Sequence, residues 1–475
     1  MHLQKLVTHL QRLNKTQLKR FDEFVHSPYF KVPASSVALF DYLAPLHPQF
    51  EEKKFLPPVI AKKVKDLPTE NKQAKAGTEL LKSMERFLAI EHWAENDRNV
   101  MIDLLWAQNK LQWQALQEDN LEKLQERLEQ DKEKDIDYFY HQHLLNTIEN
   151  HGYAAKTKRN LQNDLNPVVK SLDEYYAIKK LRYHCELISR NQILGTPYNK
   201  ENIEEILETL EPYNNTNFPY VYLFVNVYKM YTGQSYESCL PFYQNIKQFA
   251  LQTEEQGLLQ ATYESIEYAQ SMSANWLNKG QMNAATEALW CFEFKIKHNQ
   301  LLEHGKITPI NFRTVVVLAI MNARDPKWIN NFIETYASHL HGDNAATNLA
   351  FAQAQYYHYI KNYKRAMPLY QQAQVKDEPV FNAVVRRWQF MCMYEQDPAN
   401  TTMLLDYLNA FEQYLKRNTD SLHQLKGMFS MIINYSRKML NAANKQQRQA
   451  VITQLEKENY FAGKPWILEQ LTNKK

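Results

Sequence analysis

Apolar residues recur every three or four positions along nearly the whole chain, which is the period of an α-helix that buries one face. The first segment, for example, places Leu3, Leu6 and Leu10 on one side. Asn14 or Thr16 is suited to cap a second helix, which must end before Pro28 because the residue preceding a proline avoids the α region. No segment shows convincing strand alternation, so the pattern predicts an all-α protein.

Longer helical segments follow in the first third of the chain. Helices are expected over residues 34–46, 55–65 and 70–93. Residues 97–131 read as one long helix with a densely charged, solvated face, because leucines keep the helical period through it. A coiled-coil seam is the alternative, but strict heptads do not persist for the three or four repeats that it requires.

From about residue 137 the pattern becomes pairs of helices separated by short polar turns. Glycine and proline are typical of such turns, because glycine reaches left-handed backbone conformations and proline ends a helix. Breaks are expected near Gly152, Gly195, Pro212, Gly233, Gly280, Gly305, Pro326, Gly342, Asp377 and Pro398. We therefore expect an N-terminal helical domain at 1–95, a long connecting helix at 96–136, and a helical repeat region with C-terminal capping helices at 137–475.

The composition supports this interpretation and removes several classes of function. Only 10 of the 475 residues are Gly, which is too few for a large sheet or for loops that cradle phosphates. The patterns GxxxxGK[ST], GxGxxG and GxSxG are absent from the sequence. Nucleotide hydrolysis, dinucleotide binding and a hydrolase nucleophile elbow therefore lose their usual sequence signatures.

Charge and cysteine content place the chain in a general class. Lys+Arg number 56 and Asp+Glu 53, and this balance of +3 does not point to nucleic acid or to an anionic membrane. The longest apolar run, 315–321, is far too short to cross a bilayer, and the first residues lack the apolar core of a signal peptide. A cytoplasmic location follows as the default. Free, buried thiols in a reducing compartment are expected at Cys185, Cys239, Cys291 and Cys392.

Histidine spacing does not favour a metal site. The close pairs are His141 with His143 and His339 with His341, and side chains two residues apart on a helix point about 200° from one another. A turn at the end of a helix could still bring His339 and His341 together, although capping of free carbonyls is the simpler role. We predict no metal, no cofactor and no catalytic residue, and hence a protein that is not an enzyme.

Residues 347–380 contain the best repeat-like segment. Ala354 and Ala366 are small where two helices of a hairpin must approach closely, and Tyr357, Tyr363 and Tyr370 fill the space beside them. This spacing resembles a tetratricopeptide repeat. Looser echoes of its second helix, which begins at residue 363, start at residues 236, 282 and 328. The four starting positions are 46, 46 and 35 apart, so the repeats are degenerate. The resemblance implies antiparallel helix pairs stacked as an α-solenoid, a right-handed superhelix with a concave face.

The N-terminal region carries a second resemblance. The string Ser27-Pro28-Tyr29-Phe30, together with the helix at 80–88, resembles a family of uncharacterised bacterial all-helical proteins. That resemblance implies the same helical fold. It brings no catalytic residue with it.

In the tetratricopeptide family, side chains of the first helix of each pair line the concave groove. The corresponding positions, expected to be exposed and to contact a partner, are Asn348, Phe351, Gln355, His358 and Tyr359. Phe351 and Gln355 depart from the lysines and asparagines of the variety that captures a terminal carboxylate, so that ligand is not expected. The alternative is that part of this stripe packs on a neighbouring repeat.

Basic residues interleaved with aromatic ones surround the same segment. The candidate basic patch comprises Lys361, Lys364, Arg365, Arg386 and Arg387, with Tyr359 and Trp388 nearby. Such a patch could stack and neutralise a single nucleic-acid strand. Alternatively, the aromatic rings belong to the hydrophobic core and the basic groups form the solvent-exposed face of the helices. We therefore predict a non-enzymatic scaffold or adaptor that binds a protein or peptide, with nucleic-acid binding as the alternative.

Overall fold

The computed structural model describes residues 2–156, 165–194, 202–375, 378–422 and 425–473. Within these ranges the chain forms helices and loops, with two isolated β-bridges and no strand. The all-α class predicted from the apolar period is confirmed. None of the helices in this part of the chain combines the length and the hydrophobicity needed to span a membrane.

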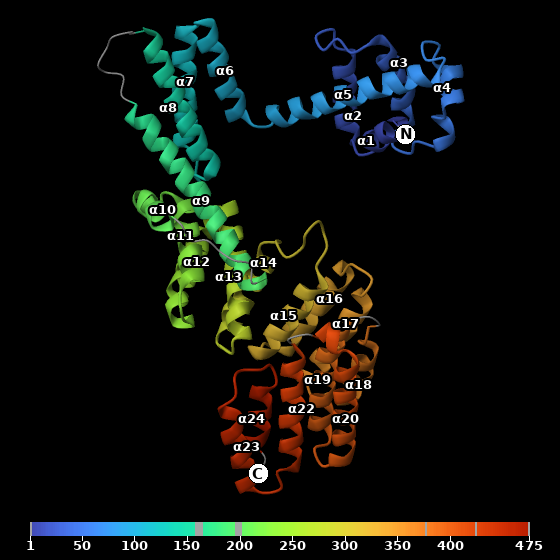
Figure 1. Ribbon diagram of the computed structural model, residues 1–475, viewed down its shortest axis with the longest axis vertical. Coiled ribbons are helices and arrows are strands. Elements are labelled where there is room, and N and C mark those ends of the chain that lie inside the picture. The colour runs from blue at the N-terminus through green and yellow to red at the C-terminus, as the bar shows by residue number, and fades with distance from the viewer. Residues whose placement is uncertain (1, 157–164, 195–201, 376–377, 423–424, 474–475) are drawn as a thin grey trace. The chain divides into compact units, whose positions relative to one another are not determined.

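Two compact units make up the chain, and we call them the N-terminal and C-terminal units. The N-terminal unit comprises Met1–Asp131 and Asp137–Leu172, and the C-terminal unit comprises Lys132–Ile136 and Asp173–Lys475. Figure 1 shows both units, coloured from blue at the N-terminus to red at the C-terminus. The division falls within one helix, α9 (Asn166–Leu194).

The N-terminal unit contains eight helices before α9 among the described residues. They are α1 (His2–Leu10), α2 (Lys15–His26), α3 (Ala34–Leu43), α4 (Pro57–Lys63), α5 (Glu70–Ala94), α6 (Asp97–Leu111), α7 (Gln114–Glu129) and α8 (Ile136–Lys156), with 3-10 turns η1 (Ala44–Leu46) and η2 (Glu52–Lys54).

Helix α2 begins and ends where the sequence predicted. The Asn14 side chain accepts a hydrogen bond from the Gln17 backbone at 2.9 Å, and the Gln17 side chain accepts one from the Asn14 backbone at 3.0 Å. This reciprocal cap satisfies two amide groups that the first turn leaves without helical partners. Helix α2 then packs into an aromatic core, where the Phe21 ring lies 5.2 Å from those of Phe40 and Phe87.

The single long helix expected over 97–131 is wrong. The chain breaks at Gln112, which adopts a left-handed conformation with φ of 60° and ends α6. Helices α6 and α7 then pack against each other as a hairpin, burying Leu105, Leu124 and Leu128 in one cluster. Gln112 is neither glycine nor proline, so the sequence contains no conventional marker for this turn.

The C-terminal unit contains fifteen further helices among the described residues. They are α10 (Ile203–Leu210), α11 (Pro219–Thr232), α12 (Tyr236–Thr253), α13 (Gln260–Asn278), α14 (Ala284–Lys297), α15 (Pro309–Met321), α16 (Pro326–Tyr336), α17 (Ala345–Tyr359), α18 (Tyr363–Gln372), α19 (Pro379–Gln396), α20 (Thr401–Arg417), α21 (Thr419–Leu422), α22 (Leu425–Asn441), α23 (Lys445–Glu456) and α24 (Lys464–Asn473), with 3-10 turns η3 (Glu211–Tyr213), η4 (Glu254–Gln256) and η5 (Ala337–His339).

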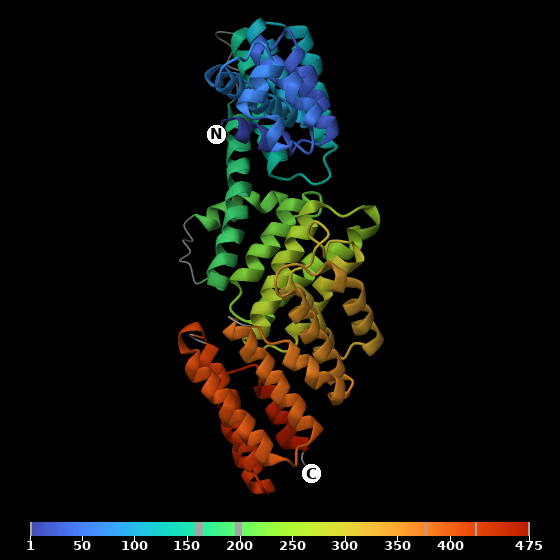
Figure 2. The same cartoon turned by 90° about the vertical axis from the view of Figure 1, so that its right-hand side faces the viewer.

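Most consecutive helices of this unit pack as neighbours (Figure 2). The closest packing joins α17 to α18, α13 to α14, and α11 to α12, while next-but-one contacts join α11 to α13, α15 to α17 and α17 to α19. Ala354 and Ala366, the small residues of the repeat-like segment, are fully buried in one cluster with Tyr370. The expected turns near Gly233, Gly280 and Gly342 are confirmed.

Three other expected breaks have different outcomes. The break at Gly152 is wrong, because α8 continues through it to Lys156. A single glycine inside a helix costs only about 1 kcal/mol relative to alanine, which such a long helix tolerates. The breaks expected at Gly195 and Asp377 lie outside the described residues.

Gly280 shows why one of these turns requires glycine. Its φ is 94°, and a Cβ atom on it would lie 2.7 Å from Cγ of Tyr460. The turn between α13 and α14 therefore needs both the left-handed backbone and the space that only glycine provides. It also brings a turn in the middle of the sequence into contact with the loop before α24.

All four cysteines are free and buried, as the sequence predicted. Burial raises the pKa of the Cys291 and Cys392 thiols to about 12. Thiols with such pKa values are poor nucleophiles at neutral pH, because the thiolate is the reactive form. They pack as small apolar side chains.

Candidate functional site

The stripe expected to line a groove is largely inside the structure. Asn348, Phe351, Gln355 and His358 are each at most 5% exposed, so the expectation that they are accessible is wrong. Tyr359 is half-buried, and its hydroxyl donates to the Arg324 carbonyl at 3.2 Å. These five residues do lie together on α17, as their spacing predicted.

The neighbouring helix α19 explains this burial. The Phe351 ring lies 5.4 Å from that of Phe381, and the His358 ring lies 5.8 Å from that of Trp388. Both partners belong to α19, so α17 packs sideways against this helix. At these two positions the stripe therefore packs on a neighbouring helix instead of facing solvent.

The five residues of the basic patch fall into two groups. Lys361, Lys364 and Arg365 are exposed at the start of α18, whereas Arg386 and Arg387 are half-buried on α19. Burial lowers the pKa of Arg387 to about 10. The basic patch therefore does not present five equivalent cations to a ligand.

A network of polar side chains joins α17, α18, α19 and α24 around the Glu395 carboxylate. His358 Nε2 lies 3.1 Å from Glu395 Oε2, and His358 Nδ1 lies 3.1 Å from the Tyr370 hydroxyl. Tyr363 donates to the same carboxylate oxygen at 3.4 Å. Trp466 Nε1 donates to the other oxygen at 2.8 Å.

The charges and hydrogen bonds of this network indicate a structural role, in which it holds neighbouring helices together. Burial alone would raise the pKa of Glu395, but the hydrogen bonds from His358, Trp466 and Tyr363 and the charge of His358 outweigh it, so the pKa is lowered. Burial holds the pKa of the Tyr370 hydroxyl well above its ordinary value. Both carboxylate oxygens and both imidazole nitrogens have protein partners, an arrangement that stabilises the packing of four helices.

An open pocket of about 340 Å³ lies between the start of α19 and the first half of α15. The pocket is lined by Arg313, Glu378, Pro379, Val380, Phe381 and Val384.

Arg313 gives this pocket its positive charge. Its guanidinium carbon lies 4.4 Å from the centre of the Phe381 ring, and its Nε donates to the Pro309 carbonyl at 3.3 Å. Burial lowers its pKa, partly offset by the charge of Glu378. Among the described residues no carboxylate lies within ion-pair distance of this guanidinium, and the Glu378 carboxylate instead accepts a hydrogen bond from Asn344.

This pocket was not predicted from the sequence, although Arg313 was one residue that could have indicated it. Arg313 precedes the longest apolar run of the chain and is the one charged residue of helix α15. A lone cation on a buried helix needs a compensating neighbour, which here is the Phe381 ring. The sequence could not show that a residue 68 positions later supplies that ring.

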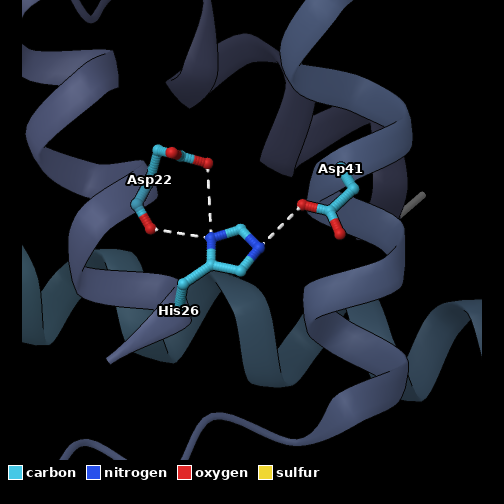
Figure 3. Close-up of side chains that lie close together, drawn as sticks. All are labelled: Asp22, His26 and Asp41. Atoms are coloured by element: carbon cyan, nitrogen blue, oxygen red, sulfur yellow. Dashed lines mark hydrogen bonds and ion pairs between the residues drawn. The ribbon is translucent and has the colours of Figure 1, made fainter. Parts of the chain in front are cut away.

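One group of side chains in the described part of the chain is close enough to share a metal ion. It comprises Asp22 and His26 on α2 and Asp41 on α3, all of them exposed (Figure 3). His26 Nε2 lies 3.1 Å from Asp41 Oδ1. His26 Nδ1 lies 2.9 Å from the Asp22 carbonyl and 3.3 Å from Asp22 Oδ1.

The geometry of these three side chains is better suited to a protonated His26 than to a bound metal ion. The two carboxylates face different nitrogens on opposite sides of the imidazole ring, and a ring nitrogen that binds a metal must be unprotonated (Figure 3). An imidazolium, by contrast, donates from both nitrogens. The bond to the Asp22 carbonyl and the charges of Asp41 and Asp22 raise the pKa of His26 against a smaller effect of burial.

The histidine pairs singled out in the sequence bind neighbouring polar groups. His339 Nδ1 lies 2.9 Å from the Gly305 carbonyl, and His341 Nδ1 lies 3.0 Å from the Ile307 carbonyl. Each ring thus anchors the loop before α15. His141 Nε2 lies 2.9 Å from Asn99 Oδ1 and joins α8 to α6 in the same way.

Comparison with known proteins gives no relative for this chain: no family model, no curated protein and no solved structure matches it.

Proposed function

We propose that this protein is a non-enzymatic, cytoplasmic scaffold that binds a segment of another protein on stacked helix pairs of its C-terminal unit. Contacts between consecutive helices and between next-but-one helices support a solenoid of the tetratricopeptide kind, with α15, α17 and α19 as first helices of successive pairs. In such an array each pair buries its apolar face against its neighbours, and the outer helix faces remain available for a partner.

The observation that carries this proposal is the pocket at Arg313. It lies between α15 and α19, and it combines an apolar wall with a partly desolvated cation. Concave, mostly apolar sites with a few polar groups are the usual form of binding sites. The peptide would meet α15 and α19, while the predicted stripe on α17 forms the packed layer beneath.

The test is a selection of random peptides on the immobilised full-length chain, repeated on an Arg313→Gln variant. We expect wild-type protein to enrich a family of related peptides that the variant fails to enrich. Arg324→Gln is the matched control, because Arg324 follows the same helix and pairs with Glu293 at 2.6 Å on the surface. Equal enrichment by wild type and Arg313→Gln, or no enrichment at all, would argue against peptide binding at this pocket.

A second candidate function, binding of single-stranded nucleic acid, has one observation in its favour. Tyr176 and Tyr183 on α9 are 50% and 57% exposed, and the Lys180 ammonium lies 5.6 Å from the centre of the Tyr176 ring. Exposed rings beside a cation can stack bases and neutralise a backbone. Binding of a labelled poly-U RNA at two salt concentrations tests this. Affinity that neither falls with salt nor depends on Tyr176 and Tyr183 would exclude it.

A further inference from the structure

The Arg313 pocket also specifies the chemistry of a partner, and this inference rests on the function proposed above. Its guanidinium is fixed on two sides: the Phe381 ring lies 4.4 Å from it, and its Nε is occupied by the Pro309 carbonyl at 3.3 Å. The Nη groups are the donors that remain for a ligand. A guanidinium held in one plane is suited to a carboxylate, which it can bind through two parallel hydrogen bonds.

The charge of the pocket favours a ligand group with a single negative charge. Arg313 is the one cation that lines the pocket, and Glu378 lies on the same wall. A phosphate group carries nearly two negative charges at neutral pH and is usually bound by several cations or backbone amides. Beside Glu378 the dianion would be repelled more strongly than a carboxylate.

The remaining wall is aliphatic. Pro379, Val380 and Val384 line it, and Val380 is 38% exposed at its edge. Ile310, one turn before Arg313 on α15, is 67% exposed. Covering such surfaces is favourable by about 25 cal/mol per Å² of apolar area, so an aliphatic side chain next to the acidic one adds affinity.

We propose that the Arg313 pocket binds an internal peptide segment in which a glutamate or aspartate stands next to a bulky aliphatic residue. The acidic side chain meets the Nη groups of Arg313. The neighbouring aliphatic side chain packs on Pro379, Val380 and Val384. A carboxylate at the end of a peptide is not required, because the acid is supplied by a side chain.

The experiment measures binding of three nonapeptide libraries to the full-length chain. All peptides carry an acetylated N-terminus and an amidated C-terminus, which removes terminal charges. The central pair is Glu-Leu in either order in the first library, Gln-Leu in the second and Glu-Gln in the third, and the other positions are random. We expect the first library to be retained about tenfold more than the second, the ratio that corresponds to 1.4 kcal/mol for one charge-assisted interaction.

Variants of the pocket make the origin of that ratio clear. Arg313→Gln should reduce it to about one, while Arg324→Gln should leave it unchanged. Glu378→Gln should raise retention of the Glu-Leu library, because it removes the repelling carboxylate from the wall. Circular dichroism of each variant verifies folding, and Glu378→Gln tests the same site without touching the Phe381 stack.

Equal retention of the Glu-Leu and Gln-Leu libraries would overturn the inference, and so would the absence of retention of all three. In either case, the random-peptide selection described above still decides separately whether the chain binds peptides. A Glu-Leu preference that survives Arg313→Gln would place the acid elsewhere and overturn the assignment of this pocket.

Discussion

Two histidine–carboxylate pairs, one in each unit, show how burial changes the meaning of the same chemistry. His26 and Asp41 are 3.1 Å apart with both side chains about half exposed. His358 and Glu395 are also 3.1 Å apart, but the histidine side chain is 5% exposed and the carboxylate 26%. Distance alone would make the two pairs equivalent.

Their surroundings separate them. In the exposed pair the resolved shift is on the histidine, whose pKa rises because its two nitrogens face a carbonyl and two carboxylates. In the buried pair the resolved shift is on the carboxylate, whose pKa falls because three donors converge on it. Solvent screens the first arrangement, while the second is largely shielded from water, so most of its hydrogen-bonding groups must be satisfied by protein partners. The buried pair should therefore contribute more to the free energy of unfolding. Its contribution should fall as pH is lowered, whereas that of the exposed pair should fall as pH is raised.

The largest expected effect comes from Glu395→Ala. Removal of the carboxylate leaves the partly buried donors of His358, Tyr363 and Trp466 without an acceptor, which should lower the free energy of unfolding by roughly 2–4 kcal/mol. Urea unfolding followed by circular dichroism measures it. Asp41→Ala is the matched control in the exposed pair and should change stability by less than about 0.5 kcal/mol. Equal losses in the two variants would remove the distinction drawn above.

Ala366→Leu tests the packing beneath the buried pair. Ala366 is fully buried between α17 and α18, so the larger side chain should destabilise by roughly 1–3 kcal/mol through overpacking. Gln371→Leu, at an exposed position of the same helix, should have almost no effect. An unchanged melting temperature for Ala366→Leu would contradict the alignment of this segment with the repeat.

Acidification should weaken the buried pair. Because the pKa of Glu395 is lowered on folding, its contribution is fully present above the unfolded pKa near 4.5 and is lost as pH falls through the folded value. The stability difference between wild type and Glu395→Gln should therefore shrink as pH falls from 6 to 3. A difference that stays constant over that range would mean that the carboxylate charge plays no part.

The exposed pair should show the smallest effect, with the opposite sign. The pKa of His26 is raised, so its contribution is present below the unfolded pKa near 6.5 and is lost as pH rises through the folded value. At such exposure it should amount to a few tenths of a kcal/mol. Proton NMR titration of His26 in wild type and Asp41→Asn measures the shift directly. An unchanged pKa in Asp41→Asn would show that Asp41 contributes nothing.

Much of the buried region could be predicted from the sequence, because the signals there are local. The spacing of Ala354, Ala366 and Tyr370 marks two helices that must approach closely, and all three residues are buried in one cluster. The exposure of the α17 stripe could not be predicted in the same way. It depends on the packing of Phe351 and His358 against α19, and periodicity does not show which neighbour covers a helix face.

Because periodicity does not show which distant segments meet, two further features could not be predicted from the sequence. The Arg313 pocket arises because Phe381, far along the chain, lies beside a single arginine. The α6–α7 turn arises at Gln112, a residue type with no turn preference of its own, where the packing of two leucine-rich faces outweighs local propensity. Neither is encoded by adjacent residues.

The contact between Gly280 and Tyr460 has a consequence for synthesis. The two residues are 180 positions apart, and a ribosome adding about 5–20 residues per second needs roughly 10–40 s to cover that interval. Helices α13 and α14 can pair long before then, since their own contacts are local. Their shared turn nevertheless remains uncovered until Tyr460 has emerged. The C-terminal helices thus complete a surface that was made much earlier, and a nascent chain halted before them would leave that surface open to other proteins.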